Sequence, residues 1–377
     1  MIPLQYASLR ILLSYMDVNQ RIQLSKRCPS LTRIEKDVSL KIQHLEFQNL
    51  QTVVNDTCYK LSVYRHYPPG VAVPRGHLME NDEGGVPADL DEFGFKETSR
   101  NTPVILTPGD VSLYSQLAEQ TSRYGPEYQI VYRFRLCEEV LAIRQERDPI
   151  VVHHWLLYEE YYQKRWTSLF EDRERDELLK MPVDQVQRKR DVAEVAYLPF
   201  YYRKNSMSPP YTPLLQLTIE SPDGRKIERY PYNLKLQEAL KMLNEKLLGG
   251  RSQVIPIGKV VVKKIEVLRL PIGLKMSSKA LEMGSSPFKA VSPLLDPSSF
   301  PLSHLQIINA SPIDIYGLIG NRHLRNAQNL IFETEEDHFD KTFCSIVKRL
   351  LNPNVAVKIG THTKIYRKNS RDTMRME

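Results

Sequence analysis

Four short apolar segments recur at a nearly constant interval in the C-terminal part of the chain. The positions that mark them are separated by 24, 25 and 25 residues: Leu281, Leu305, Leu330 and Val355. The stretches between them, such as SPFKAVSPLLD and HFDKTFCSIVKRLL, are suited to a helix or a helical turn. A single strand–helix unit of this length cannot bury its own apolar face, so neighbouring units must stack. The interval therefore predicts a row of stacked units.

This interval is typical of a divergent leucine-rich-repeat-like solenoid of the α/β class, and an ordinary α/β domain is the alternative. Alternate positions along such strands point away from the core. The outward positions beside the strands are Glu282, Gln306 and Glu333, with the acidic loop ENDEGG at the rim. We expect these residues to form a polar surface that contacts a target protein, because a small molecule would need a closed apolar pocket.

The periodicity of the sequence changes several times along the 377 residues, which predicts an α+β protein. Residues 66–110 are rich in proline and glycine, and we expect them to be irregular. We divide the chain into a helical module (1–40), a β-rich segment with Pro/Gly-rich loops (41–126), a charged segment with long helices (127–195), a β-hairpin with an amphipathic helix (196–275), the strand–helix repeats (276–361) and a basic tail without regular structure (362–377).

The opening module contains apolar residues at helical spacing. Asp17 and Asn19 then provide a turn and a helix cap, and Pro29 ends a second short helix. Further along, SPDGRK predicts a hairpin turn, and Gly249–Gly250 predicts the end of an amphipathic helix. These local signals predict where individual elements begin and end.

The charge of the chain is unevenly distributed. The net charge is +7, and Arg251–Lys279 contains seven basic residues and one acidic residue, whereas Glu80–Glu97 contains seven acidic residues and one basic residue. The basic block alternates with apolar residues, as a half-exposed strand does. A solvated strand face is therefore our main interpretation. Nucleic-acid binding by this block and by the tail KIYRKNSRDTMR is the rival hypothesis.

No motif in the sequence predicts catalysis, a cofactor or a metal ion. DLDEFG begins like a calcium loop, but Phe93 occupies a ligand position and Arg100 occupies the twelfth position. His153 and His154 are adjacent, so they diverge on a helix. No window holds eighteen consecutive apolar residues, and the four cysteines lie far apart. We expect a non-enzymatic protein with reduced thiols, no membrane partner, and a cytoplasmic or nuclear location.

Residues 2–31 resemble a degenerate F-box. The resemblance rests on an early Pro-Leu, the apolar helix, YMD, and RIQLSKRCPSL. Leu31 stands where the motif has its closing tryptophan. The resemblance implies docking on a Skp1-like adaptor of a cullin-based ubiquitin ligase. The implied contacts are Pro3, Leu4, Leu9, Leu12, Leu13, Met16 and Leu24; alternatively, the leucines pack on the following strands.

The similarity extends over almost the whole chain to a nematode family of uncharacterised F-box C proteins. It is carried by several strings in order, among them ENDEGGVPADLDEFGF, LPFYYRKN, PPYTPLLQLTI and YPYNLKLQEALKMLNEKLLGGRS. The resemblance implies that the protein is a substrate receptor that selects an unknown target protein. The alternatives are an interaction protein that has lost Skp1 binding and, less favoured, a nucleic-acid-binding protein.

Overall fold

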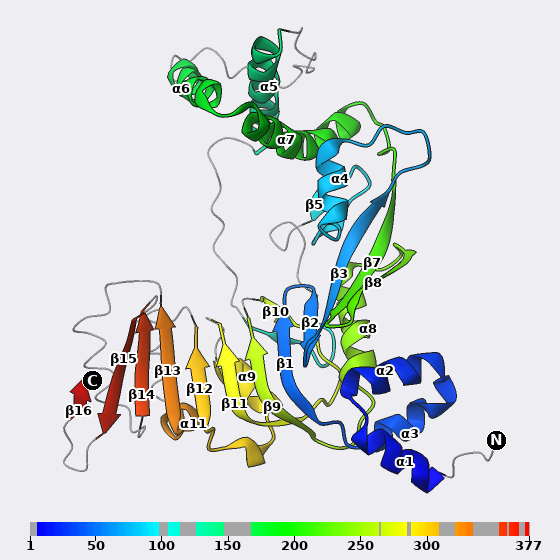
Figure 1. Cartoon of the computed structure of the whole chain (residues 1–377), viewed down its shortest axis with the longest axis vertical. Coiled ribbons are helices and arrows are strands. Elements are labelled where there is room, and N and C mark those ends of the chain that lie inside the picture. Colours follow the sequence, from blue (N-terminus) through cyan, green and yellow to red (C-terminus); the bar gives the residue numbers. More distant parts are fainter. Residues whose placement is uncertain are drawn as a thin grey trace.

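A computed structural model describes most of the chain (Figure 1). The described residues are 6–97, 105–113, 126–146, 167–263, 265–284, 288–308, 321–334, 354–359, 362–368 and 374–376. They form a mixed α+β protein that is organised around one large mixed sheet of twelve strands. Two further pairs of very short strands accompany it.

The large sheet combines strands from three separate parts of the sequence. Their spatial order is β16 (Met374–Met376), β15 (His362–Lys368), β14 (Asn354–Ile359), β13 (Asn329–Thr334), β12 (His304–Ile307), β11 (Met276–Met283), β9 (Ile255–Val262), β1 (Ile42–Gln48), β2 (Gln51–Val54), β3 (Thr57–His66), β7 (Thr212–Ser221) and β8 (Gly224–Pro231).

The middle of the sheet is parallel. Neighbouring strands from β1 and β9 through β11, β12 and β13 to β14 all pair in parallel. The register places one row of apolar residues side by side across these strands: Leu45, Val260, Leu281, Leu305, Leu330 and Val355. The first five of these are fully buried. The predicted interval of 24 or 25 residues therefore coincides with the observed strand register.

Both ends of the sheet are antiparallel, and the end that contains β3, β7 and β8 joins distant segments. β3 pairs with β7 over nine residue pairs, so that Leu61 lies opposite Leu217. β7 and β8 form the predicted hairpin around Pro222 and Asp223. One sheet therefore crosses the predicted boundaries between the segments 41–126, 196–275 and 276–361.

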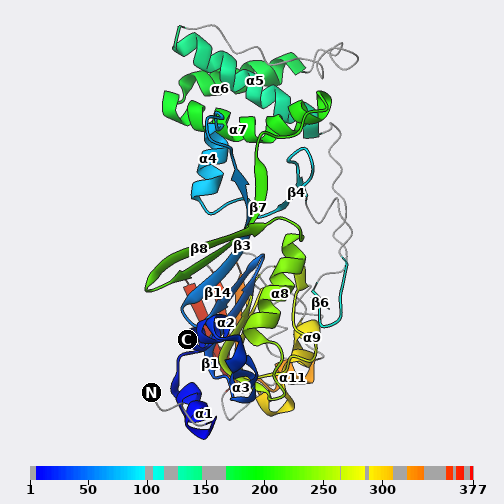
Figure 2. The same cartoon turned by 90° about the vertical axis from the view of Figure 1, so that its right-hand side faces the viewer.

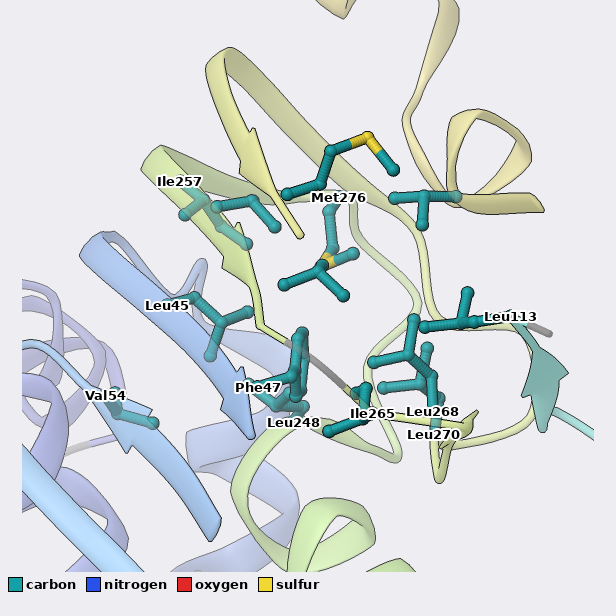
Figure 3. Packing of buried hydrophobic residues seen from close by; sticks show 14 of the residues in the cluster. Leu45, Phe47, Val54, Leu113, Leu248, Ile257, Ile265, Leu268, Leu270 and Met276 are labelled. Carbon is teal, nitrogen blue, oxygen red and sulfur yellow. The ribbon is translucent and has the colours of Figure 1, made fainter. Parts of the chain in front are cut away.

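Helices cover one side of the sheet, as Figure 2 shows for α8 (Leu236–Leu248), α9 (Phe288–Val291) and α11 (Arg322–Arg325). α8 buries residues at spacings of three and four, including Leu236, Leu240, Leu243 and Leu247, and it ends at Gly249 as predicted. Figure 3 shows Phe47 of β1 beside Leu248 and Ile265 in the core. The short helical turns η2 (Ser292–Leu294) and η3 (Pro297–Ser299) lie between β11 and β12 along the chain.

Two groups of helices lie outside this layer. The N-terminal module contains α1 (Tyr6–Tyr15), α2 (Val18–Arg27), η1 (Pro29–Leu31) and α3 (Thr32–Asp37). A helical arm contains α5 (Pro126–Arg144), α6 (Thr167–Lys180) and α7 (Val183–Lys204), and Figure 1 shows it at the far end of β3 and β7. The arm has small cores of its own, in which Phe134 stacks on Tyr197.

Three expectations need correction. Residues 66–110 are not wholly irregular, because they include α4 (Arg75–Asp82), β4 (Asp89–Leu90) and β5 (Lys96–Glu97), and β6 (Val111–Ser112) follows and pairs with β10 (Val267–Leu268). α7 crosses the predicted boundary at 195, since it continues to Lys204 and contains Pro199. The segment 362–377 contains β15 and β16, which pair with β14 and with each other, so it is not a tail without structure. The proposed helices within 147–166 and 338–351 lie outside the described residues.

Candidate protein-interaction site

The N-terminal module is attached to the sheet mainly through α2. The Asp17 carboxylate caps α2 by accepting hydrogen bonds from the backbone N–H groups of Asn19 (2.8 Å) and Gln20 (3.2 Å), as predicted. The buried Asn19 side chain donates to the carbonyl of Val54 at 3.0 Å and accepts from the hydroxyl of Tyr59 at 3.0 Å. These contacts fix α2 against β2 and β3.

A buried clamp connects the module to the segment that follows α8. Glu35 of α3 lies between Arg21 (3.0 Å) and Arg251 (2.5 Å), and all three side chains are at most 3% exposed. Both guanidinium groups also donate to the backbone carbonyls of Glu35 and Val38. Burial lowers the pKa of Arg21, and the Glu35 carboxylate opposes that effect. Removing the Glu35 carboxylate would leave uncompensated charge in the interior.

α1 presents a set of apolar side chains to solvent. Ile11 is 61% exposed, Leu12 46% and Tyr15 88%. Residues three and four apart lie on the same side of a helix, so these three form one continuous surface, which we call the α1 stripe. Tyr6 is also exposed, at the start of the helix. Contiguous exposed apolar surface is typical of protein docking sites.

The residues predicted to contact an adaptor have different environments. Leu12 belongs to the α1 stripe, while Leu9, Met16 and Leu24 are half-buried. The prediction for Leu13 is wrong, because Leu13 is fully buried and therefore packs inside the protein. Pro3 and Leu4 lie outside the described residues.

Two members of the stripe, Ile11 and Tyr15, are not among the contacts predicted from the sequence. The prediction followed the spacing of the leucines, and that spacing marks the packed side of the helix. Placing Leu13 on the buried side of a helical wheel puts Ile11 and Tyr15 on the opposite side. This signal was present in the sequence.

The three predicted target contacts lie on one face of the parallel strands, opposite the apolar row. Glu282 and Gln306 are paired across β11 and β12. Glu282 forms an ion pair with Lys259 at 2.5 Å, and the Gln306 amide donates to Glu333 at 2.8 Å. All three are half-buried. The register therefore brings these side chains together as a connected polar surface.

Carboxylates neutralise much of the basic block. Lys263 forms an ion pair with Glu46 at 2.6 Å, and Arg269 with Asp110 at 2.7 Å. Burial opposes ionisation of Glu46, but hydrogen bonds from Lys263 and from Gln48 hold the pKa of Glu46 below its usual value. Together with the pairs of Lys259 and Arg251 described above, these contacts disfavour a continuous track for phosphates.

The acidic segment ENDEGG is not at the rim of this polar surface. Figure 1 shows α4, which contains its first residues, next to the helical arm and away from β11 to β13. Glu80 forms ion pairs with Arg65 and with Lys96. Its charge is therefore used to attach α4 to β3 and β5.

A shallow hollow of about 450 Å³ lies where β1, β9 and β11 begin. Ser278 and Ser299 line it, and both are buried. The Ser278 hydroxyl donates to the carbonyl of Ala280 at 2.8 Å, and the Ser299 hydroxyl accepts from the N–H of Ser278 at 3.0 Å. These hydroxyls therefore have partners within the protein.

Within the described ranges, no cluster of His, Cys, Asp and Glu is arranged to hold a metal ion. No helix in that part of the chain combines the length and the apolar character that a bilayer span requires. Cys28, Cys58 and Cys137 are free thiols, and burial raises the pKa of Cys137 to about 11. Cys344 lies outside the described residues.

Residues 235–368 match a family described as a domain of unknown function (DUF3557). The match begins at the cap of α8 and extends through the parallel strands to the end of β15. No curated protein and no solved structure matches the chain. Arg251 lies within the matched residues, so the clamp joins the N-terminal module to this domain.

Proposed function

We propose that the protein is a non-enzymatic adaptor-binding receptor. In this proposal α1 docks on a Skp1-like subunit of a cullin-based ubiquitin ligase, and the polar face of the parallel strands contacts a target protein. The proposal joins the F-box resemblance of residues 2–31 to the exposed surface of α1. The single observation that carries it is the α1 stripe, which exposes three large apolar side chains on one side of α1.

The clamp supports this arrangement for a physical reason. A receptor must hold its target at a defined position relative to the ligase, so its two binding surfaces need a fixed orientation. Buried, charge-assisted hydrogen bonds connect Glu35 of α3 both to Arg21 of α2 and to Arg251, which lies between α8 and β9 in the matched domain. In this proposal the clamp keeps the two surfaces in a fixed relative orientation.

The test is direct binding of the purified full chain to a purified Skp1-like adaptor. Leu12→Asp places a charge in the centre of the α1 stripe and should weaken binding at least tenfold, which is about 1.4 kcal/mol or more. Ile272→Asp is the matched control, because Ile272 is 73% exposed on a loop of the sheet domain. It should bind like the unmodified protein.

Binding that Leu12→Asp leaves unchanged would contradict the assignment of α1. No binding by the unmodified chain would favour the alternative, an interaction protein without an adaptor. Retention on heparin that falls steeply with salt would revive the nucleic-acid hypothesis.

A further inference from the structure

We propose that the free edge of β8 is a second interaction surface, which binds an extended acidic segment of a partner protein as an added strand. This inference is independent of the proposed function, because β8 lies outside both α1 and the parallel strands. β8 is the last strand of the sheet and pairs only with β7 among the described residues. Figure 2 shows it projecting on the side away from α8 and α9.

The exposure of β8 leaves both of its faces accessible. Seven of its eight residues are exposed, and Glu228 is the exception. Its large apolar side chains Ile227 and Tyr230 are 41% and 42% exposed. A strand with one unpaired edge presents backbone donors and acceptors to any extended chain that approaches it.

The register fixes which backbone groups are free. Ser221 pairs with Gly224 across a two-residue turn, and residues that flank such a turn exchange both backbone hydrogen bonds. Hydrogen-bonded and non-hydrogen-bonded pairs alternate along β7 and β8 from this pair onward. The residues of β8 in the non-hydrogen-bonded pairs, Arg225, Ile227 and Arg229, therefore direct their N–H groups away from β7. The next outward position is Pro231, which has no N–H to leave unpaired, and this agrees with the alternation.

The edge is already ordered before any partner binds. The Arg229 guanidinium lies 3.6 Å from the centre of the Tyr64 ring and donates to Gln216 at 2.9 Å. Gln216 is buried and donates to the carbonyl of Gly84 at 2.9 Å. Lys26 of α2 contacts Glu228 at 2.5 Å. Binding would therefore cost little ordering of the strand itself.

The charge of the edge selects the partner. The side chains around it carry four positive and two negative charges: Lys26, Arg225, Lys226 and Arg229 against Glu220 and Glu228. Burial opposes ionisation of Glu228, but hydrogen bonds from Lys226, Lys26 and Tyr230 lower its pKa to about 2. The negative charge of Glu228 is thus already compensated by Lys26 and Lys226 within the protein. A second copy of β8 would bring like charges together, whereas an acidic strand would be attracted.

An alternating peptide tests the inference. Acetyl-(Glu-Val)4-amide can place glutamates on the face that carries Arg225 and Arg229, and acetyl-(Lys-Val)4-amide is the control. Hydrogen exchange of individual amides would be measured on the full chain at about 1 mM peptide. The acidic peptide should slow exchange of the outward amides of Arg225, Ile227 and Arg229 at least tenfold. The inward amides of Lys226 and Tyr230 should be protected with or without peptide.

Two variants separate strand addition from attraction by charge alone. Ile227→Pro removes one outward donor without removing a bond to β7, and it should abolish the protection while the inward amides stay protected. Arg225→Glu should weaken the effect at least tenfold, while Arg173→Glu, on the exposed surface of α6, should not. Equal protection by the basic peptide, or binding without protection of the outward amides, would overturn the inference.

Discussion

Two parts of the large sheet, a parallel half (β9 and β11 to β14) and an antiparallel half (β1 to β3, β7 and β8), are assembled from the chain in different ways. In the parallel half, β11 to β14 follow one another along the sequence and pair in that order. In the antiparallel half, β3 pairs with β7 although the whole helical arm lies between them in sequence. A local repeat is therefore sufficient to specify neighbours in the first half, whereas the second half requires closure of a long insertion.

The halves also differ in what they leave exposed. The parallel half buries apolar residues such as Leu281, Leu305 and Leu330 on the side of its helices and keeps polar residues such as Gln306 on the other side. The antiparallel half ends in β8, which is accessible on both faces. The first half should therefore respond to mutation mainly through stability, and the edge of the second mainly through binding.

The largest expected effect is at the clamp that ties the N-terminal module to the parallel half. Glu35→Ala leaves Arg21 and Arg251 buried without their carboxylate and should lower the free energy of unfolding by about 3–5 kcal/mol. Urea unfolding measures this. The control Glu177→Ala removes an exposed ion pair with Arg173 and should cost at most about 1 kcal/mol. Equal losses in the two variants would mean that the clamp does not hold the module.

A slightly smaller loss is expected within the parallel half itself. Leu305→Ala removes a fully buried side chain from the apolar row and should cost about 2–5 kcal/mol. Gln306→Ala, the next residue on the same strand, loses a hydrogen bond on the polar face and should cost about 1 kcal/mol. A larger loss for Gln306→Ala than for Leu305→Ala would reverse the assignment of the two faces.

A pH effect is expected at His77, which lies beside the antiparallel half. His77 of α4 is 2% exposed and forms a 2.5 Å hydrogen bond with the hydroxyl of Tyr67, while burial and then Arg65 lower the pKa of His77 to about 3. Near and below pH about 6.5, His77 is protonated in the unfolded chain but stays neutral in the folded protein. The free energy of unfolding therefore falls as the pH decreases from 7.5 to 5.5. This change in pH should lower the contribution of His77 to the free energy of unfolding by about 1.4 kcal/mol.

His77→Gln has no titrating ring, so this part of the pH dependence should be absent from its unfolding free energy. An unchanged slope between pH 7.5 and 5.5 in the variant would rule out His77 as its source.

The smallest effect should be at the free edge. Ile227→Ala on β8 should change the free energy of unfolding by at most about 0.5 kcal/mol, because the side chain is 41% exposed in the folded protein. Thermal unfolding of the variant measures this. A loss of several degrees in Tm would show that β8 is packed against something and is not a free edge.

Local patterns in the sequence predicted individual elements well. Asp17 at the start of α2, Gly249 at the end of α8 and the turn after Ser221 all follow from the conformational preferences of single residues. The interval that contains Leu281 and Leu305 also matches the register. Each of these signals lies within a few residues of the feature it specifies, or repeats at a fixed distance.

Features that depend on distant segments were not predictable in this way. No local signal indicates that β1 pairs with β9, or that Arg251 approaches Glu35 across more than two hundred residues. The predicted boundary at 195 had no structural counterpart, because α7 continues past it to Lys204 with Pro199 inside the helix. At the candidate site, the leucine spacing identified α1 but not which of its sides faces solvent.

The central claim is that α1 has a packed side and a docking side, and two adjacent residues test it. Leu12→Ala and Leu13→Ala should be compared in one titration with a purified Skp1-like adaptor and in one urea unfolding series. Leu12→Ala should weaken adaptor binding about tenfold or more with little change in stability. Leu13→Ala should lose about 2–5 kcal/mol of stability and keep its affinity. Equal affinities for the adaptor in both variants and the unmodified chain would contradict the claim.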